Sequence, residues 1–164
     1  LIKASIFENV RLGKPDATRE EVAAALKNAQ CEDIIEKLPD GMDTVIGAKG
    51  VYLSGGEQQR IAIARVMLKN TPVIILDEAT AFAGPDNETR VQTAFSKLSQ
   101  DKTVIMIAHR LSTVVGADRI YIIKDGQIAE SGSSRELMGK DSLFARMWQN
   151  YQTSVRWKVQ KEAQ

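Results

Sequence analysis

The sequence predicts an α/β fold built around a mostly parallel sheet. Two strand-sized apolar runs, at 73–76 and 103–108, are rich in β-branched residues, and we expect both strands to be buried on both faces. Between them, apolar residues recur at helical spacing, with Val91, Ala94 and Leu98 on one stripe. Strands that alternate with helices are typical of a parallel α/β layer.

Helix starts are marked by the pattern Ser/Thr-x-x-Glu, in which two side chains cap the first backbone N–H groups. We interpret three occurrences as helix starts, at Thr18/Glu21, Ser54/Glu57 and Ser133/Glu136. The second begins a helix over about 55–69 that is apolar on most faces and is therefore expected to be buried.

The remaining segments are assigned by turn residues and by periodicity. Asp125-Gly126 predicts a two-residue hairpin turn between strands at 119–124 and 127–131. Residues 1–17 show no clear element before the turn at 13–16, and 42–52 is expected to be a loop. Further helices are expected at 31–38, from 85 onward, at 111–115 and at 142–151, followed by a frayed tail.

Composition limits the classes of function. The 164 residues fit one domain or a substantial piece of one, and 43% are apolar. Because 22 Lys and Arg balance 21 Asp and Glu, no long-range attraction to nucleic acid or anionic lipid is expected. The lone Cys31 cannot form an internal disulfide, which favours a reducing compartment. The opening lacks Met and starts in mid-pattern, so we expect the chain to be a segment of something longer.

Two adjacent carboxylates, Asp77 and Glu78, follow the first strand directly. They lie at its C-terminal end, where open α/β sheets bind ligands. Neighbouring strand residues point to opposite faces, so one carboxylate could hold Mg²⁺ while the other polarises a water. A strand that simply ends in two solvated acids is an equally good interpretation of these two residues alone.

Two more features gain meaning only in combination. Ser54-Gly55-Gly56 stands at a helix start, where free N–H groups attract anions, although a plain capping box after a glycine turn explains it as well. His109, the only histidine, follows the second strand and would lie near Glu78 if the two strands are neighbours. A lone histidine is otherwise most often structural or exposed.

A phosphate-binding P-loop, G-x-x-x-x-G-K-[ST], would be expected beside such features. The two Gly-Lys pairs, Gly13-Lys14 and Gly139-Lys140, are followed by Pro15 and Asp141, so neither fits. We therefore expect the groups that bind a triphosphate most directly to lie outside these residues.

Together these motifs resemble the nucleotide-binding domain of ATP-binding-cassette (ABC) transporters of the exporter type. Four segments carry the resemblance: A-S-I-F-E-N-V-R-L-G at 4–13, L-S-G-G-E-Q-Q-R at 53–60, V-I-I-L-D-E at 73–78 and A-H-R-L-S-T-V at 108–114. They are similar to the segment after the Q-loop, the signature motif, the Walker B strand and the switch-histidine segment. The resemblance implies an incomplete P-loop NTPase core plus an α-helical subdomain, without the Walker A motif and the Q-loop.

The resemblance also implies a division and a set of roles. Residues 1–70 would form the α-helical subdomain with the signature motif, and 71–164 the C-terminal part of the ATPase core. Asp77 would support Mg²⁺, Glu78 would act as catalytic base or water orienter, and His109 would contact the γ-phosphate of ATP. The residues expected to contact nucleotide bound to a partner domain are Ser54, Gly55, Gly56 and Gln58.

As a function, the resemblance implies ATP hydrolysis that powers transport across a membrane, with export expected. The partners would be a second nucleotide-binding domain, head to tail, and the coupling helices of a transmembrane domain, at the cytoplasmic face of the plasma or inner membrane. We expect these residues alone to be soluble and inactive.

Two departures from the family pattern bear on this interpretation. The loop at 44–50 has Val45 and Ala48 where exporters usually carry acidic residues, and the D-loop reads Ala83-Gly84 where relatives place an aspartate after the alanine. A chromosome-maintenance or repair ATPase would predict long heptads and a basic surface, which the sequence lacks. A non-catalytic interaction module is favoured weakly by Gly84, but Glu78 and His109 argue against it.

Overall fold

The computed structural model describes residues 1–47, 51–77, 85–108, 111–139 and 141–162. Its contacts divide the chain into two compact units, Leu1–Ile107 and Ala108–Gln164. This division differs from the boundary expected at 70/71 because it reflects contacts and not functional motifs. Each unit is described by itself.

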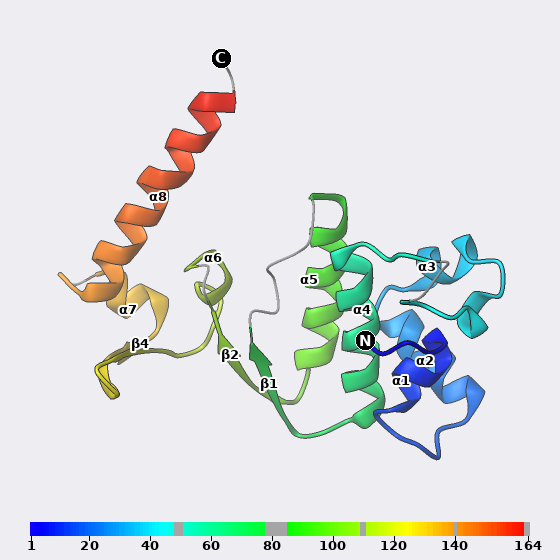
Figure 1. The fold of residues 1–164 in the computed structure, drawn as a ribbon. Coiled ribbons are helices and arrows are strands. Elements are labelled where there is room, and N and C mark those ends of the chain that lie inside the picture. Colours follow the sequence, from blue (N-terminus) through cyan, green and yellow to red (C-terminus); the bar gives the residue numbers. More distant parts are fainter. Residues whose placement is uncertain (48–50, 78–84, 109–110, 140, 163–164) are drawn as a thin grey trace. The chain divides into compact units, whose positions relative to one another are not determined.

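The first unit is mostly helical, with one pair of strands (Figure 1). Its elements are α1 (Ile6–Arg11), α2 (Arg19–Asn28), α3 (Glu32–Lys37), the short 3₁₀ helix η1 (Gly41–Asp43), α4 (Gly55–Lys69), β1 (Val73–Asp77), α5 (Pro85–Ser99) and β2 (Thr103–Ile107). In the second unit the elements are α6 (Leu111–Val114), β3 (Ile120–Lys124), β4 (Gln127–Gly132), α7 (Ser134–Met138) and α8 (Leu143–Glu162).

Helix α4 is the centre of the first unit. It packs against α1, α2 and α5, and Figure 1 shows it between α5 and the α1–α2 pair. Ile61, Ile63 and Ala64 are its buried apolar residues, and they belong to the main core. The bounds of α4 match the predicted helix, which confirms that capping and periodicity define this element.

Strands β1 and β2 are parallel neighbours joined through α5, as the sequence predicts. The register runs from Val73 opposite Thr103 to Asp77 opposite Ile107. The prediction that both faces are buried is wrong for the described residues, because Ile74 lies in the core but Ile75 is 68% exposed. The helices of this unit cover one face of the strand pair, and the other face remains open.

All three predicted capping boxes are present, and a fourth was missed. Ser5 and Glu8 cap α1, a helix that the sequence interpretation left unassigned although the same Ser-x-x-Glu pattern marks it. The frayed tail predicted after 151 is also wrong, since α8 continues to Glu162. No glycine or proline interrupts residues 143–162, so nothing in the local sequence ends the helix earlier.

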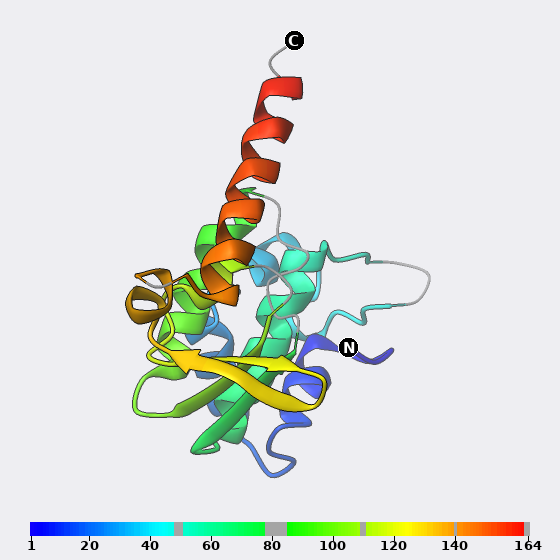
Figure 2. The ribbon, with the colours of Figure 1, turned by 90° about the vertical axis from the view of Figure 1, so that its left-hand side faces the viewer.

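The second unit contains the predicted hairpin, the β3–β4 ribbon drawn in yellow in Figure 2. Asp125 and Gly126 both have positive φ, 52° and 76°, as a tight two-residue turn requires. Behind the hairpin, Glu130 accepts hydrogen bonds from the backbone N–H groups of Leu143 (2.7 Å) and Phe144 (3.2 Å). A side chain of β4 therefore accepts hydrogen bonds from the first N–H groups of α8, which have no acceptor within the helix.

The close approach of α1 to α4 leads to a stability prediction. A Cβ atom at Gly13 would overlap with the backbone carbonyl oxygen of Arg65 on α4, which cannot swing away. We expect Gly13→Ala to lower the free energy of unfolding by about 1–3 kcal/mol, the usual cost of overpacking. The measurement is urea denaturation followed by circular dichroism.

Gly116→Ala is the matched control for this substitution. Nothing lies within 4 Å of a Cβ atom placed at Gly116, so its effect should stay within about 0.5 kcal/mol. Equal stability of the two variants would contradict the close contact between the α1–α2 connection and α4.

Candidate functional site

Ser54 stands at the N-cap of α4 and is exposed. Its Oγ accepts a hydrogen bond from the N–H of Glu57 at 3.3 Å, and a Glu57 carboxylate oxygen accepts one from the N–H of Ser54 at 2.8 Å. A hydroxyl that accepts still has its own proton to donate. Within the described part of the chain, no hydrogen bond donated by the Ser54 hydroxyl is found.

The capping box of α1 provides a comparison. There the Ser5 hydroxyl donates to Glu8 Oε2 at 3.1 Å while its Oγ accepts from the N–H of Glu8. That proton is used inside the protein, whereas the proton of Ser54 is available to a ligand. The two interpretations left open by the sequence are therefore compatible, since Ser54 caps the helix and can still bind an anion.

The first turn of α4 adds backbone donors. The N–H groups of Gly55 and Gly56 have no intrahelical acceptor in an α-helix, and the helix dipole adds positive potential there. Gly55 is exposed, while Gly56 is buried. Exposed Gln58 donates from Nε2 to the carbonyl oxygen of Leu53 at 2.9 Å, which fixes the backbone just before Ser54. The helix start is thus an ordered site that an anion can reach.

Asp77 ends β1 and is exposed at the C-terminal edge of the strand pair. Because Asp77 pairs with Ile107 at the end of β2, both strands end at the same edge. The sequence prediction that His109 lies near Glu78 required the two strands to be neighbours, and β1 and β2 are neighbours. Glu78, His109, Ala83 and Gly84 themselves lie outside the described residues.

One exposed carboxylate suits Mg²⁺, which keeps several waters and takes one or two carboxylates together with substrate phosphates. Asp77 fits that donor chemistry. In the described part of the chain, no group of three or more His, Cys, Asp or Glu side chains gathers to hold a metal by itself.

Beneath the helix start lies a charged cluster that the sequence interpretation missed. Arg60 of α4 has a fully buried side chain, and its Nη1 and Nη2 donate to Asp33 Oδ1 (2.7 Å) and Oδ2 (3.1 Å) of α3. Arg60 Nη1 also donates to the carbonyl oxygen of Gln30. Arg90 of α5 lies 3.1 Å from Asp33 Oδ1. The burial of Arg60 could have been predicted from its position, because residues 56, 60 and 64 share one face of the helix.

Two opposing effects act on the Asp33 carboxyl group. Its partial burial would raise its pKa, but the hydrogen bond from Arg60 and the charges of Arg60, Arg90 and Lys37 outweigh that effect. The pKa of Asp33 is therefore lower than usual. The carboxylate is held ionised between its arginines.

The buried Cys31 has no reactive character. Its side chain has no exposed area, and burial raises the pKa of its thiol to about 12. A protonated, enclosed thiol is inert as a nucleophile.

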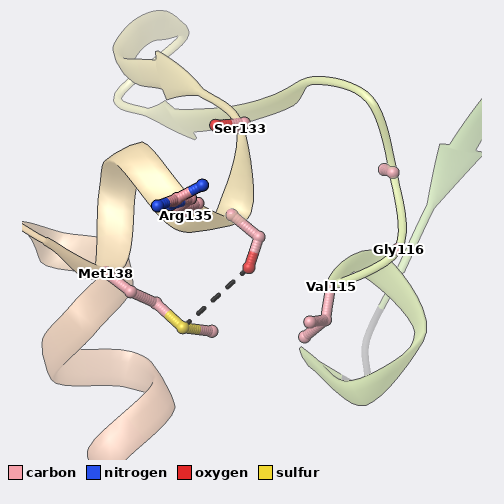
Figure 3. Close-up of a pocket in the computed structure, with 7 residues that line it drawn as sticks. Val115, Gly116, Ser133, Arg135 and Met138 are labelled. Atoms are coloured by element: carbon pink, nitrogen blue, oxygen red, sulfur yellow. Dashed lines mark hydrogen bonds between the residues drawn. The ribbon is translucent and has the colours of Figure 1, made fainter.

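A separate pocket in the second unit has a different character (Figure 3). It has a volume of about 550 Å³ and is lined by Val115, just after α6, and by Arg135 and Met138 of α7. In it, the Ser134 hydroxyl lies 3.9 Å from the sulfur of Met138. The pocket contains none of the residues that the sequence predicted to act on nucleotide.

Comparison with known proteins agrees with the motifs. Residues 3–81 match the family model described as ABC transporter. The chain is 47% identical over 154 residues to the mycobactin import ATP-binding/permease protein IrtA of Mycobacterium tuberculosis, covering 94% of this chain and 18% of that protein. It is 45% identical over 148 residues to a putative multidrug export ATP-binding/permease protein of Staphylococcus aureus, covering 90% of this chain and 26% of that one.

Among solved structures, a bacterial Atm1-family ABC exporter with ATP bound superposes with a TM-score of 0.82 at 41% identity. The match covers 92% of this chain and 26% of that chain. The fold is thus that of part of an ABC ATPase core. The chain belongs to the ABC transporter family, and it spans between 18% and 26% of the length of these curated relatives.

In the part of the chain that the structure describes, none of the helices is both long enough and apolar enough to cross a membrane.

The charged cluster predicts a pH-dependent contribution to stability. Asp33→Asn replaces the carboxylate that pairs with the buried guanidinium of Arg60 by a neutral amide, so we expect it to lower the free energy of unfolding at pH 7 by about 2–4 kcal/mol. Because folding lowers the pKa of Asp33, its stabilisation is present above the unfolded pKa of about 3.9 and is lost as pH falls toward the folded value. Urea denaturation from pH 7 to pH 3 should show the difference between wild type and variant shrinking below about pH 4. A difference that stays constant with pH would contradict an ionised Asp33.

Proposed function

We propose that this chain is part of the nucleotide-binding domain with which a longer ABC transporter hydrolyses ATP to drive transport. The observation that carries the proposal is the start of α4, where the exposed Ser54 has a hydroxyl proton to donate beside first-turn N–H groups. The sequence holds no P-loop, so this anion site complements phosphate-binding groups supplied from elsewhere. The names of the relatives, ATP-binding/permease proteins, support the same activity.

The chemistry we propose is phosphoryl transfer to water, which depends on positioning and charge neutralisation. Asp77 would hold Mg²⁺ at the strand edge, and the metal would neutralise charge on the phosphates. Glu78 would orient the attacking water and take its proton, and His109 would contact the γ-phosphate. The parallel pairing of β1 and β2 supports this proposal, because open α/β sheets bind ligands at the edge where such strands end.

The partners follow from the same proposal. Ser54, Gly55 and Gln58 would meet ATP held by a second nucleotide-binding domain arranged head to tail, with Gly56 allowing that close approach. The D-loop at Ala83-Gly84 would face that domain without the usual carboxylate. A transmembrane domain would contact this one through its coupling helices, at the cytoplasmic face of the membrane, as the fused permease parts of the relatives suggest.

The loop before the signature motif is the proposed contact with that transmembrane domain. Isolated bridges from Val45 to Ser5 and from Ile46 to Val51 fix the base of this loop. Val45 is exposed where exporters usually carry an acidic residue, so the contact here would be apolar.

Glu78→Gln tests the proposed catalytic carboxylate. In the full-length protein, Gln keeps the shape of the side chain but cannot accept the proton of water, so hydrolysis should fall by about 10²-fold or more. ATP binding should stay within about twofold of wild type, since the change affects the transition state more than the bound substrate. Phosphate release and filter binding of labelled ATP give the two quantities. Near-normal turnover would remove Glu78 from the mechanism.

Ser54→Ala tests the anion site, with Thr18→Ala as its matched control. Each residue caps its own helix of the first unit through a capping box of the same kind, with an O···N distance of 3.3 Å. Each substitution should therefore cost about 1 kcal/mol of stability. Only Ser54→Ala should slow ATP hydrolysis by the full-length protein, by about tenfold, because one charge-assisted hydrogen bond is lost. Equal rates in the two variants would show that Ser54 only caps the helix.

A further inference from the structure

We infer that Asp33 and Arg90 are positioning residues, which orient the start of α4 relative to α5 in the ATPase reaction. The inference rests on the proposed function. The two residues contact neither β1 nor the helix start itself in the described structure; they would act through Arg60 and through the two helices that they join.

The geometry centres on one oxygen atom. Asp33 Oδ1 accepts from Arg60 Nη1 at 2.7 Å and lies 3.1 Å from Arg90 Nη1, so helices α3, α4 and α5 meet at a single carboxylate. The Arg60 side chain is fully buried, Asp33 is 23% exposed and Arg90 is 49% exposed. The cluster therefore extends from the core to the surface.

Each arginine lies near the start of its helix. Arg60 comes six residues after Ser54, and Arg90 comes five residues after Pro85, the first residue of α5. The segment between β1 and α5 carries Glu78 and the D-loop residues Ala83 and Gly84. The shared carboxylate thus links the helix that presents Ser54 to the helix that follows the proposed catalytic segment.

Apolar packing between α4 and α5 does not fix orientation by itself. The hydrophobic effect is non-directional, so apolar packing restricts orientation only through the fit of the side chains. Hydrogen bonds to a carboxylate are directional, and charged ones are the strongest. The Asp33–Arg90 pair also crosses the expected boundary between the α-helical subdomain (1–70) and the ATPase core (71–164).

The two arginines differ in what they require chemically. Arg60 uses a two-pronged contact with both carboxylate oxygens, which only a guanidinium provides. Arg90 contacts one oxygen, so a lysine ammonium at the same position can replace it. Arg60 therefore serves folding above all, while Arg90 can be changed with little effect on the core.

The experiment measures ATP hydrolysis against ATP concentration in the full-length protein. The variants are Arg90→Gln, which removes the charge, and Arg90→Lys, which keeps it. Lys97→Gln is the control: it also neutralises an exposed cation of α5, and the described structure shows no ion pair to Lys97.

For Arg90→Gln we expect KM for ATP to rise about threefold or more, because fewer molecules hold the start of α4 in the orientation that closes on nucleotide. Its melting temperature should stay within about 2 °C of wild type, since a half-exposed ion pair contributes little stability. Arg90→Lys should return KM to within about twofold of wild type, and Lys97→Gln should match wild type.

Three outcomes would overturn the inference. They are wild-type kinetics in Arg90→Gln, equal impairment in Arg90→Gln and Arg90→Lys, and a large drop in melting temperature that accounts for the lost activity. Glu78→Gln assayed alongside separates this from the proposed function: if it hydrolyses ATP normally, the proposed function fails whatever Arg90 does.

Discussion

The buried guanidinium of Arg60 constrains much of the first unit. An arginine does not lose its proton inside a protein, so its enclosed charge must be matched by acceptors. Asp33 supplies a carboxylate, and Gln30, at a positive φ of 60°, turns its carbonyl oxygen toward the same group. The turn before α3 and the placement of α3 against α4 therefore follow from one side chain. Apolar packing elsewhere in the core imposes no comparable direction.

The same helix separates two tasks along its length. Its start, Ser54 and Gly55, is exposed and presents hydrogen-bond donors, while Arg60, Ile61, Ile63 and Ala64 are buried. An anion site works best when its donors are already oriented before the ligand arrives, because reorganisation then costs little. A rigid, polar attachment one to two turns below the donors provides that orientation. Structural and functional demands on the L-S-G-G-E-Q-Q-R segment are in this way complementary.

Local signals in the sequence predicted much of this structure, and tertiary ones accounted for the errors. Capping boxes and the Asp125-Gly126 turn depend on neighbours a few residues away, so they could be read directly, and the missed box at Ser5 was just as readable. The open face at Ile75 depends on what covers the strands, which no local pattern reports. Arg60 was missed because a charge on a helix is normally assigned to the surface. The pairing of β1 with β2 was predictable from the sequence. Glu78 and His109, which follow these strands, lie outside the described residues.

Two of the relatives differ in the direction of transport that their names give, but hardly in their similarity to this chain. One protein named for import and another named for multidrug export are 47% and 45% identical to the chain, nearly the same distance. In the proposed function, the anion site on α4, the carboxylate at the strand edge and the charged link between helices would serve ATP hydrolysis for either direction of transport. On this proposal, the direction of transport would be determined where the domain meets its membrane partner. The segment of this chain proposed to make that contact is the loop after Thr44, whose base is joined to Ser5, the N-cap of α1, by a bridge from Val45.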